Sequence, residues 1–469
     1  MPRVVVVGGG VAGLAAAHRL SEVAPEFDVT LVEAKSRLGG TIRSERVDGY
    51  VIDRGPDSII TEKPSALKLA ERLGLQERII RTQDAYRGAY VVAHGRLVPV
   101  PEGFALLAPS AWWPLMSSSI LSWSGKLRAA GDLVLPRGPE RADESLGGFV
   151  ARRLGPEMLE RLAQPMVGGI YGTAPDVLSL EATMPRFRTL ERKNRSVALG
   201  LMRGVARMKK SKRGRDHAAM GARYGLFISF DGGIEVLTDA IAARITSDVR
   251  LNSPVSGLER RGQGFALSLG EGDELLADGV ILATAAHVSA RLVEPEDARL
   301  SQHLDAIPYG SSVTVALAYR REQIPHPLDA FGFVVPTLEG RNLMACTWSS
   351  VKWPGRAPEG MVLLRCFLGG EGRDHAADLD EESLLADCRR ELKRLMGIEA
   401  DPSLVRVDRH RQVMPRYRVG HLVRAEQIEA RVAALPRLEL AGGFTRGVGI
   451  PDSIKSGEAA AESLAAELG

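Results

Sequence analysis

The first forty residues place the tightest constraint on what this chain can fold into. An apolar, β-branched run at residues 4–7 leads into Gly8, Gly10 and Gly13, which have the spacing G-x-G-x-x-G. Residues 14–20 then show the apolar pattern of a helix. A strand that turns this tightly into a helix lets a pyrophosphate approach the backbone, because glycine has no side chain to block it. The unpaired N–H groups of the first helical turn attract the same anion.

A second apolar segment, residues 29–32, ends at Glu33, twenty residues after Gly13. A carboxylate at the end of the second strand can accept hydrogen bonds from the hydroxyls of a ribose. A glycine-rich turn that only packs a helix against a sheet would not explain this acidic position. The pattern therefore predicts a dinucleotide site.

Both NAD and FAD bind to such a unit, and the segment after Glu33 decides between them. Residues 37–40 (RLGG) place a basic side chain and two glycines where the chain can wrap around a long, extended dinucleotide, which favours FAD. The apolar segment 280–285 and the glycine-rich segment 442–452 are expected to close over the rest of the cofactor. A helix predicted from Ser453 would direct its dipole at the electron-rich edge of the flavin.

The bulk composition excludes several other classes of protein. The chain has 469 residues, of which 45% are hydrophobic, so it can bury a large core, and its net charge of +3 argues against a general nucleic-acid binder. Cys346, Cys366 and Cys388 are widely spaced, so no disulfide framework or zinc site is predicted, and a reducing cytoplasmic setting is expected. No signal peptide and no transmembrane helix are expected.

The sequence contains no pattern of a nucleophilic or metal-dependent enzyme. Neither G-x-S-x-G nor H-E-x-x-H occurs, and the nine histidines are scattered without metal-ligand spacing. We therefore predict no catalytic side chain and no metal site. Flavin chemistry fits this absence, because N5 of the cofactor carries the reaction and the protein orients the substrate.

Two segments in the middle of the chain leave alternatives open. Residues 112–123 hold three tryptophans among aliphatic residues, prolines and serines, and form either buried core or a surface that faces a membrane or an apolar substrate. Residues 186–215 are strongly basic and form either a solvated stretch or a patch that attracts acidic groups.

Strand patterns at residues 313–319, 332–335, 343–347 and 362–368 predict an antiparallel sheet in a second domain. Helices are predicted over 145–162 and 381–396. The predicted fold class is α/β, α+β overall, with a Rossmann-type FAD-binding domain, an antiparallel-sheet substrate domain and a helical domain. The expected ranges are 1–62, 225–290 and 405–469 for the first, 63–103 and 291–404 for the second, and 104–224 for the third, which is the one that could face a membrane.

Several motifs together resemble the bacterial porphyrinogen oxidases of haem synthesis, which are FAD enzymes of the amine-oxidase-like superfamily. The superfamily-wide pieces are GGGVAG and RLGG, and the more specific ones are RGPDS, PMVGGIYG and GVGIPDSI. The resemblance covers essentially the whole chain. It is greatest to the branch that oxidises coproporphyrinogen III.

The resemblance implies a role for each matching position. Gly8, Gly10, Gly13 and Glu33 should hold the adenosine diphosphate half of FAD, and Val255 should contact the adenine. The full set expected to bind FAD is Gly8, Gly9, Gly10, Val11, Ala12, Gly13, Glu33, Ala34, Arg37, Gly39, Gly40, Thr41, Gly55, Pro56, Asp57, Ser58, Val255, His410, Gly443, Val448, Gly449 and Ile450. The set expected to bind substrate is Gly169, Ile170, Phe333, Phe367 and Arg87.

Two positions depart from the family pattern. His410 stands four residues before Met414-Pro415, where the family often has tryptophan. Ala89 precedes Tyr90, where the protoporphyrinogen-specific type often has an arginine that would pair with a propionate, although Arg87 is nearby. The second departure favours the coproporphyrinogen branch.

The implied reaction is hydride transfer from a bridging carbon of a porphyrinogen to FAD. Repeated steps yield the aromatic porphyrin, and molecular oxygen reoxidises the flavin to give hydrogen peroxide. The expected partners are a porphyrinogen and oxygen, with no nucleic acid. The protein is expected in the cytoplasm. Peripheral contact with the inner face of the cell membrane and the choice between a monomer and a homodimer are left open.

Other functions on the same fold also stay open. A protoporphyrinogen IX oxidase is the nearest alternative. An amine oxidase would be expected to carry an aromatic cage beside the flavin, but only 5% of the residues are aromatic. A carotenoid desaturase and a non-catalytic flavoprotein that acts as a scaffold are the remaining alternatives.

Overall fold

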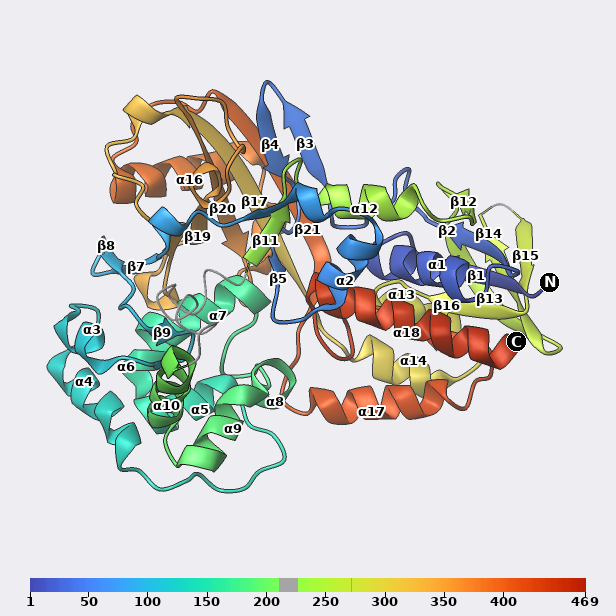
Figure 1. Ribbon diagram of the computed structural model, residues 1–469, viewed down its shortest axis with the longest axis horizontal. Coiled ribbons are helices and arrows are strands. Elements are labelled where there is room, and N and C mark those ends of the chain that lie inside the picture. The colour runs from blue at the N-terminus through green and yellow to red at the C-terminus, as the bar shows by residue number, and fades with distance from the viewer. Residues whose placement is uncertain (211–226, 271) are drawn as a thin grey trace.

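The computed structural model describes residues 1–210, 227–270 and 272–469. A five-stranded parallel sheet contains the first and the last strand of the chain (Figure 1). Its order is β12-β2-β1-β16-β22, which is the 3-2-1-4-5 order of a Rossmann-type sheet. The strands are β1 (Arg3–Val7), β2 (Asp28–Val32), β12 (Asp248–Arg250), β16 (Gly279–Leu282) and β22 (Leu438–Leu440). The predicted Rossmann-type fold is confirmed, and its strands come from widely separated parts of the sequence.

Helices cover one face of this sheet, and a mixed layer covers the other. Alternate residues of β1 point to opposite faces, so Val4 and Val6 pack against helices whereas Val5 and Val7 pack on the other side. The first layer holds α1 (Val11–Val23), α2 (Ser65–Arg72), α12 (Glu235–Ala242) and α18 (Ile450–Leu468). The second holds β13 (Val255–Arg261), β14 (Gly264–Leu269), β15 (Asp273–Ala277), α13 (Ala286–Val293), α14 (Ala298–Asp305) and α17 (His421–Val432).

A seven-stranded sheet forms the second body of the fold, with the order β21-β17-β20-β19-β18-β7-β8. Its strands are β7 (Tyr90–Ala93), β8 (Arg96–Pro99), β17 (Tyr309–Arg320), β18 (Gly332–Val334), β19 (Leu343–Trp348), β20 (Met361–Gly369) and β21 (Leu404–Pro415). All its pairs are antiparallel except β18 with β7, which is parallel. The predicted helix α16 (Glu381–Met396) covers one face (Figure 1).

Helices gather in a third region at the lower left of Figure 1. They are α3 (Trp112–Ser117), α4 (Trp123–Ala130), α5 (Leu146–Leu154), α6 (Pro156–Met158), α7 (Gln164–Tyr171), α8 (Leu180–Thr183), α9 (Pro185–Asn194) and α10 (Val197–Lys210), with a π-helical turn at Leu159–Ala163. The single helix predicted over 145–162 is wrong, because the chain breaks at Gly155, whose φ of 96° is open to glycine but strained for other residues.

Shorter elements complete the fold. They are β3 (Ser44–Val47), β4 (Tyr50–Asp53), β5 (Ile59–Ile60), β6 (Ile79–Arg81), β9 (Phe104–Ala105), β10 (Ala108–Pro109), β11 (Phe227–Phe230) and α15 (Ser349–Lys352). Short 3-10 turns lie at Gln76–Arg78, Asp84–Tyr86, Gly131–Leu133, Arg321–Gln323, Thr337–Glu339 and Asp374–Asp378. None of the described helices is both long and apolar enough to cross a membrane.

The tryptophan-rich segment divides between core and surface. Leu115, Ile120 and Leu121 are buried among the helices of the third region. Trp113 and Trp123 are 81% and 68% exposed. Of the basic run, residues 186–210 lie in α9, α10 and their connection, whereas the positions after Lys210 lie outside the described residues.

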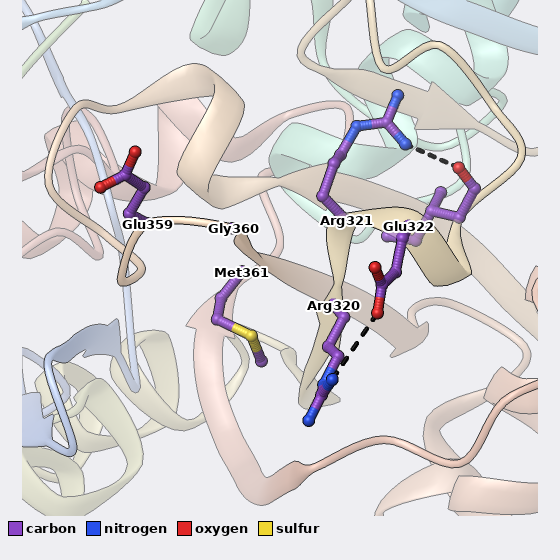
Figure 2. Close-up of a pocket in the computed structure, with 7 residues that line it drawn as sticks. Arg320, Arg321, Glu322, Glu359, Gly360 and Met361 are labelled. Atoms are coloured by element: carbon purple, nitrogen blue, oxygen red, sulfur yellow. Dashed lines mark hydrogen bonds and ion pairs between the residues drawn. The ribbon is translucent and has the colours of Figure 1, made fainter.

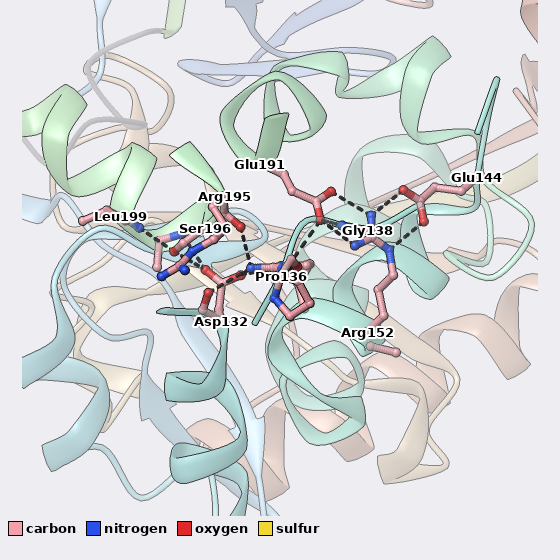
Figure 3. Close-up of polar contacts among 12 residues, drawn as sticks. Asp132, Pro136, Gly138, Glu144, Arg152, Glu191, Arg195, Ser196 and Leu199 are labelled. Atoms are coloured by element: carbon pink, nitrogen blue, oxygen red, sulfur yellow. Dashed lines mark hydrogen bonds and ion pairs between the residues drawn. The ribbon is translucent and has the colours of Figure 1, made fainter. Parts of the chain in front are cut away.

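A buried charge network holds the third region together (Figure 3). Asp132 is fully buried and accepts hydrogen bonds from Arg153, from the hydroxyl of Ser196 at 2.6 Å and from the backbone N–H of Ala198 at 3.0 Å. Arg153 also donates to three carbonyl oxygens. Because no buried side-chain nitrogen or oxygen of this pair lacks a hydrogen-bond partner, its burial is tolerated.

Replacing Asp132 with Asn should destabilise the protein by about 3–5 kcal/mol, because the buried Arg153 would lose its nearer counter-charge and keep only Glu191, at 3.5 Å. Urea unfolding of the flavin-loaded protein measures the change. The control is Glu274→Gln, which removes one partner of an ion pair whose side chains are 57% and 43% exposed and should change stability by less than about 1 kcal/mol. Equal effects of the two substitutions would contradict this account of the network.

Candidate functional site

The turn between β1 and α1 is built by close backbone contact. A Cβ atom at Gly13 would overlap the carbonyl oxygen of Gly8, so the helix can pack on the strand only with glycine there. Gly8 itself has a φ of 107°. Gly10 is the N-cap of α1 and has no side chain to bond the first helical N–H groups. These N–H groups are therefore available to an anion at the predicted pyrophosphate position.

A second glycine loop lies against this turn. Gly39 donates its N–H to the carbonyl oxygen of Gly9 at 2.8 Å, and a Cβ atom at Gly40 would lie 3.0 Å from the Cα atom of Gly10. The Arg37 guanidinium donates to the carbonyl oxygens of Leu38, Gly40 and Ile42. Arg37 thus fixes the shape of its own loop, and the two predicted glycine segments meet as expected.

Glu33 lies at the edge of the same turn. Its carboxylate accepts hydrogen bonds from the backbone N–H of Gly9 at 2.6 Å and of Lys35 at 2.9 Å. Ala34 beside it is exposed, and Val255 begins β13 and is half-buried. A carboxylate held rigidly beside the glycine turn suits a ribose diol.

Residues 55–58 continue from this region toward the seven-stranded sheet. A Cβ atom at Gly55 would overlap the carbonyl oxygen of Thr41, and Gly55 accepts a hydrogen bond from Arg365 on β20. Asp57 pairs with Lys352 at 3.1 Å, and Lys352 also donates to Ser58 at 2.7 Å. Burial raises the pKa of Asp57, but the cations Lys352 and Arg365 outweigh it and hold that pKa well below its usual range.

His410 supplies an unsatisfied polar atom on the adjacent strand. It lies on β21, and its Nε2 atom is buried with no hydrogen-bond partner among the described residues. Burial, followed by the nearby Arg365 cation, lowers the pKa of His410, so the ring is neutral at pH 7. A neutral imidazole nitrogen without a partner is suited to bond a polar atom of a ligand.

The C-terminal glycine turn is held by an aromatic side chain. The hydroxyl of Tyr417 donates to the carbonyl oxygen of Gly443 at 2.8 Å and accepts from the N–H of Gly447 at 2.7 Å. His421 stacks on the Tyr417 ring at 3.8 Å and bonds the carbonyl oxygen of Thr445. The turn ends at the N-terminus of α18, which begins at Ile450, three residues earlier than expected.

These segments fit an extended dinucleotide. The α1 and α18 backbones touch so closely that a Cβ atom at Gly457 would overlap the carbonyl oxygen of Ala12. A glycine cradle that side chains would fill and the unpartnered nitrogen of His410 both suit such a ligand. The residues of these segments would hold FAD.

A cavity of about 300 Å³ opens between α7 and the ends of β18, β19 and β20. Gly169 lines it, and Ile170 beside it is 37% exposed. Phe333 is instead buried in the core under α16, so the structure does not bring its ring to this cavity. Phe367 is half-buried with the Arg365 guanidinium over its ring, and Arg87 pairs with Asp84; neither lines the cavity.

A second hollow lies away from all these residues, at the far end of β17 and the start of β20 (Figure 2). Arg320 pairs there with Glu322 at 3.6 Å, and Arg321 donates to the carbonyl oxygen of Ile324. None of the predicted site residues lines this hollow. Within the described ranges, no group of three or more His, Cys, Asp and Glu side chains could hold a metal ion.

Sequence reasoning missed several residues of the site: Lys352, Arg365, Tyr417, His421 and Arg373. Arg365 carried a usable signal, because a lone arginine interrupts the apolar strand MVLLRCFLG and a charge in a buried strand needs a partner. Lys352 had no comparable signal, since its partner Asp57 is 295 positions away in the chain.

The fold and this arrangement define a flavin-dependent oxidoreductase. A family model described as flavin containing amine oxidoreductase matches residues 11–465. The chain therefore belongs to the flavin-containing amine oxidoreductase family, and the expectation of FAD as cofactor is confirmed.

Named relatives confirm the resemblance seen in the motifs. The chain is 36% identical to a coproporphyrinogen III oxidase of Bacillus subtilis, over 97% of this chain and 96% of that protein. It is 33% identical to a protoporphyrinogen oxidase of Bos taurus, over 99% of this chain and 98% of that protein. A solved structure from Exiguobacterium sp. 255-15 superposes with a TM-score of 0.88 at 30% identity, covering 99% of each chain. Reduced UDP-galactopyranose mutase, at 16% identity and a TM-score of 0.72, shares the fold.

Tyr417→Phe should weaken FAD binding, because it removes the hydroxyl that joins Gly443 to Gly447. An unmet bond to a partly buried group costs about 1–3 kcal/mol, which corresponds to a loss of affinity of roughly five- to 150-fold. Titration of the apoprotein with FAD measures it. Tyr50→Phe is the control, since no site residue bonds that hydroxyl. Unchanged FAD affinity in Tyr417→Phe would show that the turn does not depend on this bond.

The stability should also fall in acid because of His421. Burial lowers the pKa of His421 to about 4, below its ordinary 6.5. The unfolded chain therefore binds the extra proton first, and stability is lost as the pH falls from about 6.5 toward 4, by up to roughly 3 kcal/mol. Unfolding of the protein and of His421→Asn at pH 7 and pH 4.5 measures the difference. A difference between the two proteins that does not change with pH would contradict the assignment.

Proposed function

We propose that the protein oxidises coproporphyrinogen III to coproporphyrin III with FAD as cofactor. The observation that carries the proposal is the near full-length identity of 33–36% to three bacterial proteins named coproporphyrinogen III oxidase. The cavity beside Gly169 supports it, because Gly369 of its lining and the predicted cofactor residue His410 pair with the same residue, Ser312 of β17. The relatives named protoporphyrinogen oxidase make protoporphyrinogen IX the second candidate substrate.

Bound FAD supplies the hydride acceptor in this reaction. The chain has to hold a bridging carbon of the substrate within about 3–3.5 Å of the reacting flavin atom. Asp57 is already paired with Lys352 at 3.1 Å, and the Arg365 cation lies close enough to lower the pKa of both Asp57 and His410. Each hydride leaves with one proton, and over three such steps the four bridging carbons lose four hydrogens and the ring nitrogens lose two. Aromatisation of the product supplies much of the driving force, so no strong acid or base is needed.

Molecular oxygen is the proposed final acceptor, with hydrogen peroxide as its product. We place the reaction in the cytoplasm, where thiols such as those of the three buried free cysteines stay reduced.

Anaerobic reduction of the flavin tests the proposal. Coproporphyrinogen III should bleach the yellow FAD-loaded protein, and protoporphyrinogen IX should do so more slowly. Already oxidised coproporphyrin III is the control and should leave the colour unchanged. If neither porphyrinogen reduces the flavin, the proposed function is wrong, and bleaching by a polyamine would show an amine oxidase instead. A faster reaction with protoporphyrinogen IX would identify the second candidate substrate.

A further inference from the structure

The cavity beside α7 has one wall made almost entirely of glycine. Gly168, Gly169 and Gly172 come from the end of α7, and Gly369 and Gly370 from the end of β20. A Cβ atom at Gly169 or Gly172 would meet nothing within 4 Å. This wall therefore leaves space for a flat ligand edge. The volume of about 300 Å³ takes part of a macrocycle with its side chains, not a whole one.

Arg373 lines this cavity and is half-buried. It follows the Gly370–Gly372 turn at the end of β20, and its N–H donates to the carbonyl oxygen of Gly370 at 2.8 Å. One guanidinium nitrogen donates to the carbonyl oxygen of Arg341, which holds the side chain in place. That oxygen carries no net charge, so the bond orients the cation without neutralising it.

Arg373 forms no ion pair with any residue that the structure describes, unlike the arginines around it. Arg341 pairs with Glu391, Arg416 with Asp374 and Arg418 with Glu371. A partly buried cation without a carboxylate partner loses hydration and gains no compensating attraction. Burial accordingly lowers the pKa of Arg373. An anionic group of a ligand would supply the missing partner.

The acidic residues of the cavity do not compete for this role. Glu371 is bonded to Arg418 at 2.6 Å and to the backbone N–H of Ala174 at 2.8 Å. Glu160 and Asp176 are exposed at the cavity's edge, where water screens them. Arg373 is therefore the partly buried charge of the cavity that is left without a counter-charge among the described residues.

We propose that Arg373 binds a carboxylate of the substrate and so fixes how the macrocycle enters the cavity. The inference rests on the proposed function, because a porphyrinogen carries its carboxylates on flexible propionate chains at the rim of the ring. A guanidinium binds a carboxylate through two parallel hydrogen bonds, which sets direction as well as affinity. Arg373 is a substrate-binding residue that acts at a distance from the reacting carbon.

Arg373→Gln tests this assignment. The KM for coproporphyrinogen III should rise about tenfold or more while kcat changes by less than about twofold, because binding is lost and the flavin site is untouched. The dissociation constant of coproporphyrin III, measured by fluorescence quenching without turnover, should rise by a similar factor. Arg373→Lys should recover part of the lost KM and part of the lost product affinity, since lysine keeps the charge but lacks the two parallel N–H donors of a guanidinium.

Arg411→Gln is the matched control. It removes the same charge from a nearby side chain that is 57% exposed, pairs with Asp378 and does not line the cavity. If Arg373→Gln behaves like Arg411→Gln in both KM and product affinity, the assignment is wrong. If Arg373→Gln does not fold, the KM for coproporphyrinogen III and the dissociation constant of coproporphyrin III are measured on Arg373→Lys instead, and these values decide whether the assignment is right. Failure of the unmodified protein to oxidise any porphyrinogen would instead overturn the proposed function.

Discussion

The contact between the backbones of α1 and α18 is the constraint on which the site depends. Gly13 lets α1 pack against the oxygen of Gly8, and Gly457 lets α18 pack against the oxygen of Ala12. A side chain at Gly457 would separate the two helices, and one at Gly13 would push α1 away from the turn that follows β1. With glycine at both positions, the first turn of α1 lies directly against α18. The partial positive charge at the N-terminus of α1 is thereby fixed before any ligand binds.

The rest of the site is arranged around this pair of helices by polar contacts over long chain separations. Asp57 and Lys352 connect the loop after β4 to α15, and Arg365 holds Gly55 to β20 of the seven-stranded sheet. Tyr417 holds the turn that precedes α18. The glycine-walled cavity is linked to His410 through β17, because Ser312 pairs with both Gly369 and His410. The protein's contribution to catalysis is therefore position and electrostatics, which agrees with the lack of a nucleophile motif.

The sequence predicted what is local. The β1–α1 turn, the RLGG loop and the C-terminal helix are contiguous motifs whose glycines have one structural reason to be there, and they lie where expected. Ion pairs such as that of Asp57 with Lys352 could not be predicted, because the sequence around neither residue indicates which distant residue is its partner. Phe333 shows a second limit. Strand β18 is covered on both faces, so alternation along it does not indicate which face lines a site. Likewise, the sequence alone does not single out Arg373. The structure does, because it shows that the neighbouring arginines form ion pairs with carboxylates.

A crystal structure of the protein with FAD and coproporphyrin III would test the central claim most directly. The account predicts the pyrophosphate at the N–H groups of Val11–Gly13 and the flavin ring between Gly55–Ser58 and the start of α18. It also predicts that the porphyrin lies between that ring and the glycine wall of the cavity. A flavin ring away from the N-terminus of α18, or a porphyrin on another face of the molecule, would contradict it.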